Sequence, residues 1–234
     1  SFLWPRLLSL VATLITAGFL GLIVKNITGN KYLAFIPGLL FLSLKYVFIW
    51  GPLARVDMLG VMFSFLGIYW VLQYQDRNLV VADIFFLLSV FTKHSLFAAP
   101  IAAYIWLWCQ DRKQGSKHIK YFLGTGFSLL VLFTLITRGQ FFYHLVLYNM
   151  DDFSWQTVNH FFQDQFNLYL FLYLLGGAGA VLSLIKKRWL IPFYLLTSFL
   201  FSLTIGKVGS SYNYLVEFYA VLSTASVLFF HYLY

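Results

Sequence analysis

Three short polar segments stand next to apolar runs, and each places a cation near a group that could do chemistry. In the first segment, Arg55 and Asp57 stand two residues apart, directly before an apolar run. Such a pair can simply neutralise its own charges, or the Arg can orient a carboxylate that handles a substrate proton. In the second segment, Lys93 and His94 interrupt an apolar run. This pattern is typical of a tight turn between helices or of a site that binds an anionic group.

The third segment runs from Lys207 to Glu217 and combines a cation, small residues and a carboxylate. Ser210 follows a glycine just before an expected helix start, where backbone N–H groups suit a phosphate. Asn213 and Glu217 are four residues apart and therefore share a helix face, with Tyr214 between them. The alternative is an ordinary loop followed by one buried carboxylate.

Two further candidates, Arg138 and His144, stand in a long stretch with mixed polarity. We expect Arg138 to help bind a phosphate, and a substrate or metal role for His144 remains open. No pair of histidines has zinc-ligand spacing, so the identity of any metal stays unknown.

The composition defines the elements that must position these residues. Only 10% of the 234 residues are charged and 61% are hydrophobic, against about 25% charged in soluble domains. This balance predicts an integral membrane protein and excludes a soluble domain or a nucleic-acid-binding module, despite the net charge of +8. The single Cys109 excludes an intrachain disulfide framework.

The apolar runs predict an all-α, polytopic transmembrane helix bundle with about nine spans, forming a single transmembrane domain over residues 1–234. A helix needs roughly 20 mostly apolar residues to cross a bilayer. These runs are continuous rather than alternating, which argues against a β-barrel. The expected spans are 7–24, 33–52, 58–75, 79–92, 94–110, 121–137, 165–185, 189–206 and 218–234.

Positive charge predicts the orientation of the bundle. Alternating the connections places ten cations on one side and six on the other side or within the membrane. Because Lys and Arg concentrate on the cytoplasmic side, Ser1 is expected outside. The ten inner cations are Lys25, Lys31, Arg77, Arg112, Lys113, Lys117, Lys120, Lys186, Lys187 and Arg188. His118 stands among them and is expected to be solvated.

The three polar segments then share the outer end of the bundle, together with a long outer stretch from 138 to 165. In that stretch, Val158, Phe161, Phe162 and Phe166 recur at helical spacing. This predicts a helix lying in the outer membrane interface, capped by Asp151 or Asp152.

At these segments the chain resembles bacterial members of the GT-C superfamily of membrane glycosyltransferases, the group related to protein O-mannosyltransferases (family 39). Each matching motif is short, but the resemblance extends over nearly the whole chain. The similar segments are Arg55-x-Asp57, Thr92-Lys93, Gly209 to Glu217, and Arg6 to Leu10. The chain begins at what resembles the second helix of the family, so the first helix and first outer loop, with their acidic residue, are expected to be missing.

The resemblance implies transfer of a sugar from a polyprenyl-phosphate carrier to an acceptor at the outer face of a bacterial inner membrane. It assigns Asp57 and Arg55 to catalysis, with a divalent metal at Asp57 as an option. The substrate-binding residues would be Lys93, His94, Arg138, His144, Lys207, Ser210, Asn213, Tyr214 and Glu217. The partners would be the lipid-linked donor, membrane lipids and possible membrane subunits.

Two alternatives remain open at this point. The chain could be a non-catalytic GT-C-like integral membrane subunit of a larger complex. The chain could also be a transporter. Transporters commonly contain inverted repeats and binding sites at mid-membrane, whereas the charges of this chain gather near one surface.

Overall fold

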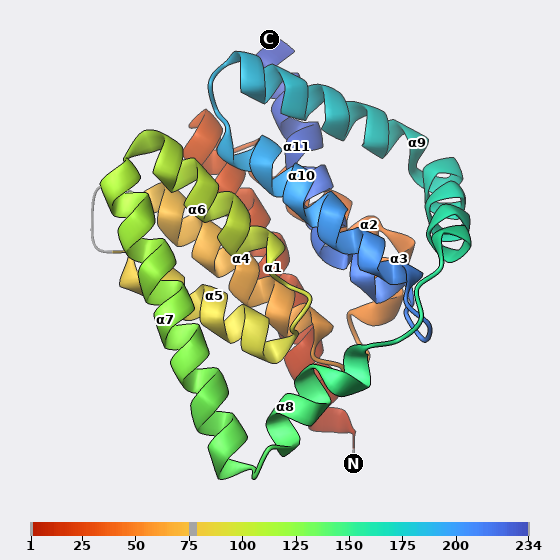
Figure 1. The fold of residues 1–234 in the computed structure, drawn as a ribbon. Helices are drawn as coiled ribbons and strands as arrows, with labels where there is room; N and C mark the ends of the chain where they lie inside the picture. The colour runs from red at the N-terminus through yellow and green to blue at the C-terminus, as the bar shows by residue number, and fades with distance from the viewer. Residues whose placement is uncertain (1, 75–78, 234) are drawn as a thin grey trace.

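The computed structural model describes residues 2–74 and 79–233, and this part of the chain is helical (Figure 1). Ser1 and Arg77, used above to predict orientation, lie outside the described residues. The α-helices are α1 (Leu3–Thr28), α2 (Phe35–Ser43), α3 (Lys45–Trp50), α4 (Asp57–Gln73), α5 (Val80–Thr92), α6 (Ala98–Gln110), α7 (Arg112–Ile136), α8 (Gln140–Leu145), α9 (Trp155–Ile185), α10 (Leu190–Ser202) and α11 (Val216–Leu233). Short 3₁₀ turns are η1 (Leu147–Asn149), η2 (Leu203–Gly206) and η3 (Tyr212–Leu215).

The predicted all-α class is confirmed over the described residues, where β pairing is limited to one isolated bridge between Phe153 and Lys207. In the part of the chain that the structure describes, four helical segments are long and apolar enough to cross a membrane: Leu3–Thr28, Arg112–Ile136, Trp155–Ile185 and Tyr212–Leu233. Asp57–Gln73, Val80–Thr92 and Leu190–Gly206 are shorter apolar helices. These lengths fit a multi-pass membrane protein, but nine spans are not confirmed.

The expected span 33–52 is broken into two short helices, α2 and α3. Leu44 between them is extended, with ψ of 130°. The backbone N–H of Lys45 donates to the hydroxyl of Tyr169 at 2.8 Å. The hydroxyl from α9 thus replaces a backbone carbonyl as the acceptor for this N–H, at the point where the helical hydrogen-bond pattern is interrupted. A side chain inserted in this way explains the break.

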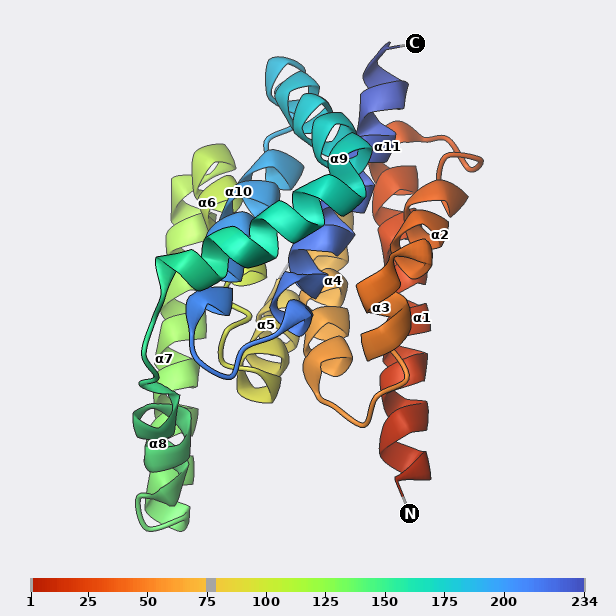
Figure 2. The same ribbon diagram turned by 90° about the vertical axis from the view of Figure 1, so that its right-hand side faces the viewer.

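The predicted interfacial helix and the expected span 165–185 form one bent helix, α9. The bend falls at Tyr169, whose φ of −127° and ψ of 30° are not helical. The N-cap is Ser154, whose side chain accepts from the N–H of Thr157. The predicted cap at Asp151 or Asp152 was therefore wrong by two or three residues. The bend turns the first half of α9 across the bundle (Figure 2).

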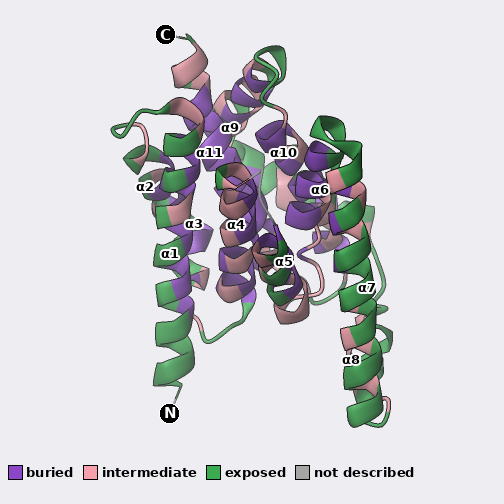
Figure 3. Ribbon diagram, turned by 90° about the vertical axis from the view of Figure 1, so that its left-hand side faces the viewer, coloured by how far each residue is buried: buried purple, intermediate pink, exposed green. Residues whose placement is uncertain are grey.

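Helix α11 forms the centre of the bundle, since every residue from Val216 to Leu228 is buried. Its closest neighbour is α9, where small residues let the two backbones approach. A Cβ added to Gly179 would lie 1.9 Å from the carbonyl oxygen of Ala225. By contrast, α1 and α7 present largely exposed faces (Figure 3), and apolar side chains such as Leu14, Phe127 and Leu135 cover them.

Candidate functional site

The carboxylate of Asp57, at the start of α4, lies at the centre of a polar cluster and is 3% exposed. Its Oδ1 accepts from Nζ of Lys93 at 2.6 Å and from Nδ2 of Asn213 at 2.6 Å. Its Oδ2 accepts from Nε of Arg55 at 2.9 Å. Three polar segments that are far apart in the sequence therefore meet on one carboxylate.

Close packing between α4 and α5 brings Asp57 to Lys93. Asp57, Gly60 and Ser64 follow helical spacing on one face of α4. The hydroxyl of Ser89, one turn before Lys93, donates to the carbonyl of Gly60 at 2.9 Å and lies 2.8 Å from the hydroxyl oxygen of Ser64. A Cβ at Gly60 would come within 2.4 Å of Cδ1 of Leu96, so a larger residue here would require the Leu96 side chain to move.

The third polar segment reaches the cluster through η3. Gly209 takes a left-handed φ of 79°, a conformation that glycine adopts without steric cost. The hydroxyl of Ser210 donates to the carbonyl of Ile205, closing the loop on itself. After this turn, Asn213 is buried against Asp57, and the ring of Tyr214 lies 4.3 Å from Nζ of Lys93.

Lys207 and His94 lie beside this cluster. Nζ of Lys207 donates to the carbonyl of Asn149 at 2.8 Å. The segment carrying Lys207 pairs with residues 152–154, because Ser154 N–H donates to Gly206 and Val208 N–H donates to Asp152. Burial, followed by the positive charges of Lys207 and Lys93, lowers the pKa of His94, so His94 is kept neutral in a cationic setting.

Glu217, on the first turn of α11, belongs to a separate buried layer. Its Oε1 accepts from the hydroxyl of Tyr194 at 2.8 Å, and Ser64 and the backbone of Ala99 add further hydrogen bonds. Glu217 thus links α11 to α10, α4 and α6. A cavity of only about 10 Å³ separates it from Lys93 and Asn213, which is room for about one water molecule.

Arg138 and His144 are not brought to this cluster. Both are exposed: Arg138 lies between α7 and α8, and His144 lies in the last turn of α8. Figure 2 shows this arm projecting beyond α3, α4 and α5, at the same end of the bundle as the N-terminus of α1. The ring of His144 packs edge-on against Tyr148 at 4.9 Å between centroids.

Several residues at this end were not singled out from the sequence. The guanidinium of Arg55 lies 4.9 Å from the ring centre of Trp50, which orients the most exposed cation of the cluster. Asp164 accepts from the hydroxyls of Tyr212 and Tyr46 at 2.9 and 3.4 Å. Tyr and Trp are so abundant in this chain that no spacing distinguishes these rings from packing residues.

A divalent metal at Asp57 does not fit the residues around it. The carboxylate is surrounded by Lys93, Arg55 and an amide N–H₂ of Asn213, all of which are donors rather than metal ligands. Within residues 2–74 and 79–233, no three His, Cys, Asp or Glu side chains are grouped to hold a metal.

A second buried polar cluster joins α5, α6 and α7. Nδ1 of His118 lies 2.6 Å from Oδ2 of Asp83, and the hydroxyl of Tyr104 donates to Oδ1 at 2.8 Å. His118 is only 1% exposed, so the expectation that it is solvated was wrong. A polar partner on α5, 35 positions away in sequence, makes its burial tolerable.

Comparison of the chain with protein-family models, curated proteins and solved structures yields no match. The resemblance to GT-C glycosyltransferases and the roles it assigns therefore stay predictions.

Proposed function

We propose that this chain is a glycosyltransferase of the bacterial inner membrane, which moves a sugar from a polyprenyl-phosphate carrier to an acceptor at the outer face. The observation that supports this best is the meeting of Arg55, Lys93 and Lys207 at one end of the helix bundle. The excess of cations at the opposite end favours an outer location for this end.

In the proposed reaction, the acceptor hydroxyl oxygen forms a bond to the anomeric carbon of the sugar. The bond from that carbon to the carrier phosphate oxygen breaks, and its electron pair stays on the phosphate. Arg55, whose side chain is 51% exposed, contacts the phosphate and stabilises its growing charge. Lys93, Lys207 and neutral His94 extend the same anion-binding surface.

Asp57 then acts as a positioning residue. Both of its oxygens are already bonded to Arg55, Lys93 and Asn213, so it orients the two cations. The acceptor proton needs another carboxylate, and Asp151 is an exposed acid close enough to Tyr214 for an electrostatic interaction. We therefore assign the general base to Asp151.

Polyprenyl phosphate binding and sugar transfer test this proposal separately. Lys93→Gln and Arg55→Gln should weaken binding of undecaprenyl phosphate about tenfold, the effect of losing roughly 1.4 kcal/mol. Asp151→Asn should keep binding but lose release of undecaprenyl phosphate from an undecaprenyl-phosphate hexose. Asp152→Asn is the matched control. Unchanged binding in both cation variants would overturn the proposal.

The second candidate is a non-catalytic membrane subunit. The cavity of about 10 Å³ beside Lys93, Asn213 and Glu217 favours it, because no sugar fits among these side chains. On this reading, the cluster joins α4, α5 and η3 structurally. The wild-type protein would then show no transfer and no saturable binding of undecaprenyl phosphate.

A further inference from the structure

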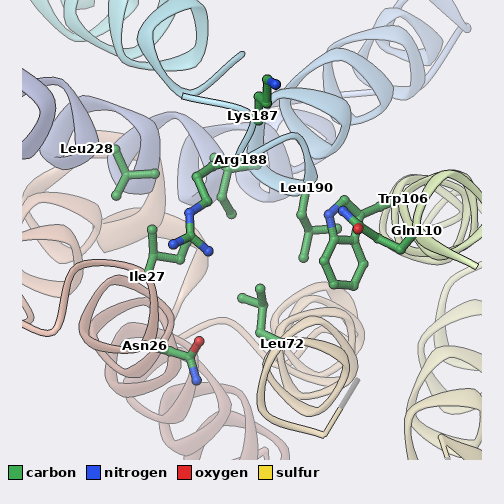
Figure 4. A pocket seen from close by; sticks show the side chains of 10 residues that line it. Asn26, Ile27, Leu72, Trp106, Gln110, Lys187, Arg188, Leu190 and Leu228 are labelled. Atoms are coloured by element: carbon green, nitrogen blue, oxygen red, sulfur yellow. The ribbon is translucent and has the colours of Figure 1, made fainter. Parts of the chain in front are cut away.

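A second site lies at the opposite end of the bundle from Asp57. Figure 4 shows a pocket between the ends of several helices, with a volume of about 240 Å³. Leu72, on the last turn of α4, lines it. Leu72 is 15 residues beyond Asp57, which is roughly 22 Å along a helix at 1.5 Å per residue, so the two sites are separate.

The walls of the pocket are mainly apolar, and a few polar groups stand among them. The apolar side chains are Ile27, Leu72, Trp106, Leu190, Ile191 and Leu228. Asn26 and Gln110 add amide groups, and two cations, Lys187 and Arg188, complete the lining. Figure 4 shows the guanidinium of Arg188 directed toward the pocket, while the ammonium of the neighbouring Lys187 points away.

The end of α9 fixes this difference between neighbours. Lys187 adopts a left-handed φ of 58°, which costs energy for a residue with a Cβ. The N–H of Arg188 donates to the carbonyl of Ser183 at 2.8 Å, and the N–H of Lys187 donates to Leu184 at 2.9 Å. This hydrogen-bonded turn closes the helix and sends Arg188 back over the bundle.

Among the described residues, 2–74 and 79–233, no carboxylate balances the charge of Arg188. No carboxylate is among the described residues that line the pocket. A guanidinium binds the oxygens of a phosphate through paired, charge-assisted hydrogen bonds. The apolar walls suit a ligand that carries hydrocarbon next to its charge.

We propose that this pocket binds the phosphate headgroup of an anionic glycerophospholipid. Arg188 contacts the phosphate, Asn26 and Gln110 contact the polar headgroup, and the apolar side chains cover the glycerol and the first acyl carbons. The pocket lies at the end of helices that are long enough to span a bilayer. The ends of such helices lie at the depth of the lipid headgroups.

Native mass spectrometry of the full chain in detergent tests this site, with phosphatidylglycerol and phosphatidylcholine as probes. The wild type should retain one phosphatidylglycerol in preference to phosphatidylcholine. Arg188→Gln should weaken this retention about tenfold, and Lys186→Gln, with the same charge change at an exposed residue outside the pocket lining, should not. Equal retention of the two lipids, or equal losses in both variants, would overturn the proposal.

Two further arms keep the test decisive. Inorganic phosphate at millimolar concentration should not displace phosphatidylglycerol, and displacement would mean a site for the free anion rather than a lipid. If Arg188→Gln fails to fold, Arg188→Lys replaces it, because lysine keeps the charge but loses the paired hydrogen-bond geometry. The Arg188→Lys protein should retain phosphatidylglycerol less well than the wild type does, but better than the wild type retains phosphatidylcholine. Neither Arg188 variant should change undecaprenyl phosphate binding at the opposite end, so this site and the proposed function can fail independently.

Discussion

The side-chain amide of Asn213 donates to Oδ1 of Asp57 at 2.6 Å, which joins two residues 156 positions apart. Asn213 is 4% exposed and Asp57 is 3% exposed. This contact fastens the loop before α11 to the first turn of α4. Removing it should leave a buried carboxylate oxygen with one donor fewer.

Asn213→Ala should therefore lower the free energy of unfolding by about 1–3 kcal/mol, the cost of an unmade hydrogen bond to a buried group. The measurement is thermal unfolding of the purified protein in detergent. Asn159→Ala, at an exposed position on α9, is the control and should leave stability unchanged. Equal stability of Asn213→Ala and wild type would show that the contact contributes nothing.

The pair formed by Lys93 and Asp57 is suited to a double-mutant cycle. Lys93→Met should destabilise the protein by about 3 kcal/mol or more, because the buried carboxylate of Asp57 loses its ion pair with Lys93. Adding Asp57→Asn removes the charge left behind, so the double variant should be more stable than the sum of the single losses predicts. Additive losses would mean that the two groups are not coupled.

Stability should fall as the pH drops through the range where a free histidine is protonated. The pKa of folded His94 lies below its usual value because of burial and the charges of Lys207 and Lys93. The unfolded chain then binds a proton that the folded chain does not, and stability rises with pH. Above about pH 6.5 His94 causes no loss in the free energy of unfolding, and below that pH the loss grows progressively.

The His94→Gln variant should flatten this dependence between pH 7.5 and pH 5. Thermal unfolding at a series of pH values would measure it, with His160→Gln, on the exposed side of α9, as the comparison. An identical pH slope in wild type and His94→Gln would contradict the assignment.

The contact between α9 and α11 predicts opposite effects at two neighbouring glycines. Gly179→Ala places a Cβ against the carbonyl of Ala225 and should destabilise the fold by about 1–3 kcal/mol through overpacking. A Cβ at Gly177 meets nothing within 4 Å, so Gly177→Ala should be neutral or stabilising by up to about 1 kcal/mol from helix propensity. Midpoints of thermal unfolding in the same detergent would compare them.

The buried pair of Asp83 and His118 is expected to be structural. His118→Phe removes one hydrogen-bond partner of the buried Asp83 carboxylate and leaves it the hydrogen bond from Tyr104. The protein should therefore be destabilised by about 3–5 kcal/mol. His144→Phe, on the exposed arm, should have little effect. Loss of undecaprenyl phosphate binding in a stably folded His118→Phe protein would instead assign the pair a functional role.

The sequence predicted the helical class and the membrane-spanning character, because both depend on the composition and length of apolar runs. It also singled out Asp57, Lys93 and Asn213, since a polar residue within an apolar run stands out whatever its partner is. It did not predict the break at Leu44. That break depends on a hydroxyl from Tyr169, 124 positions away from Lys45, and no local pattern carries this information.

Tertiary structure alone decided which polar residues meet. Arg138 and His144 have the same residue types as members of the cluster, but α7 carries them beyond the bundle, whereas helix packing at Gly60 brings Lys93 to Asp57. His118 is buried rather than solvated because Asp83 and Tyr104 come from other helices to satisfy it. Hydrophobicity is a property of each segment and can be read along the chain. Pairing of charges depends on the distance between segments, which only the packed bundle fixes.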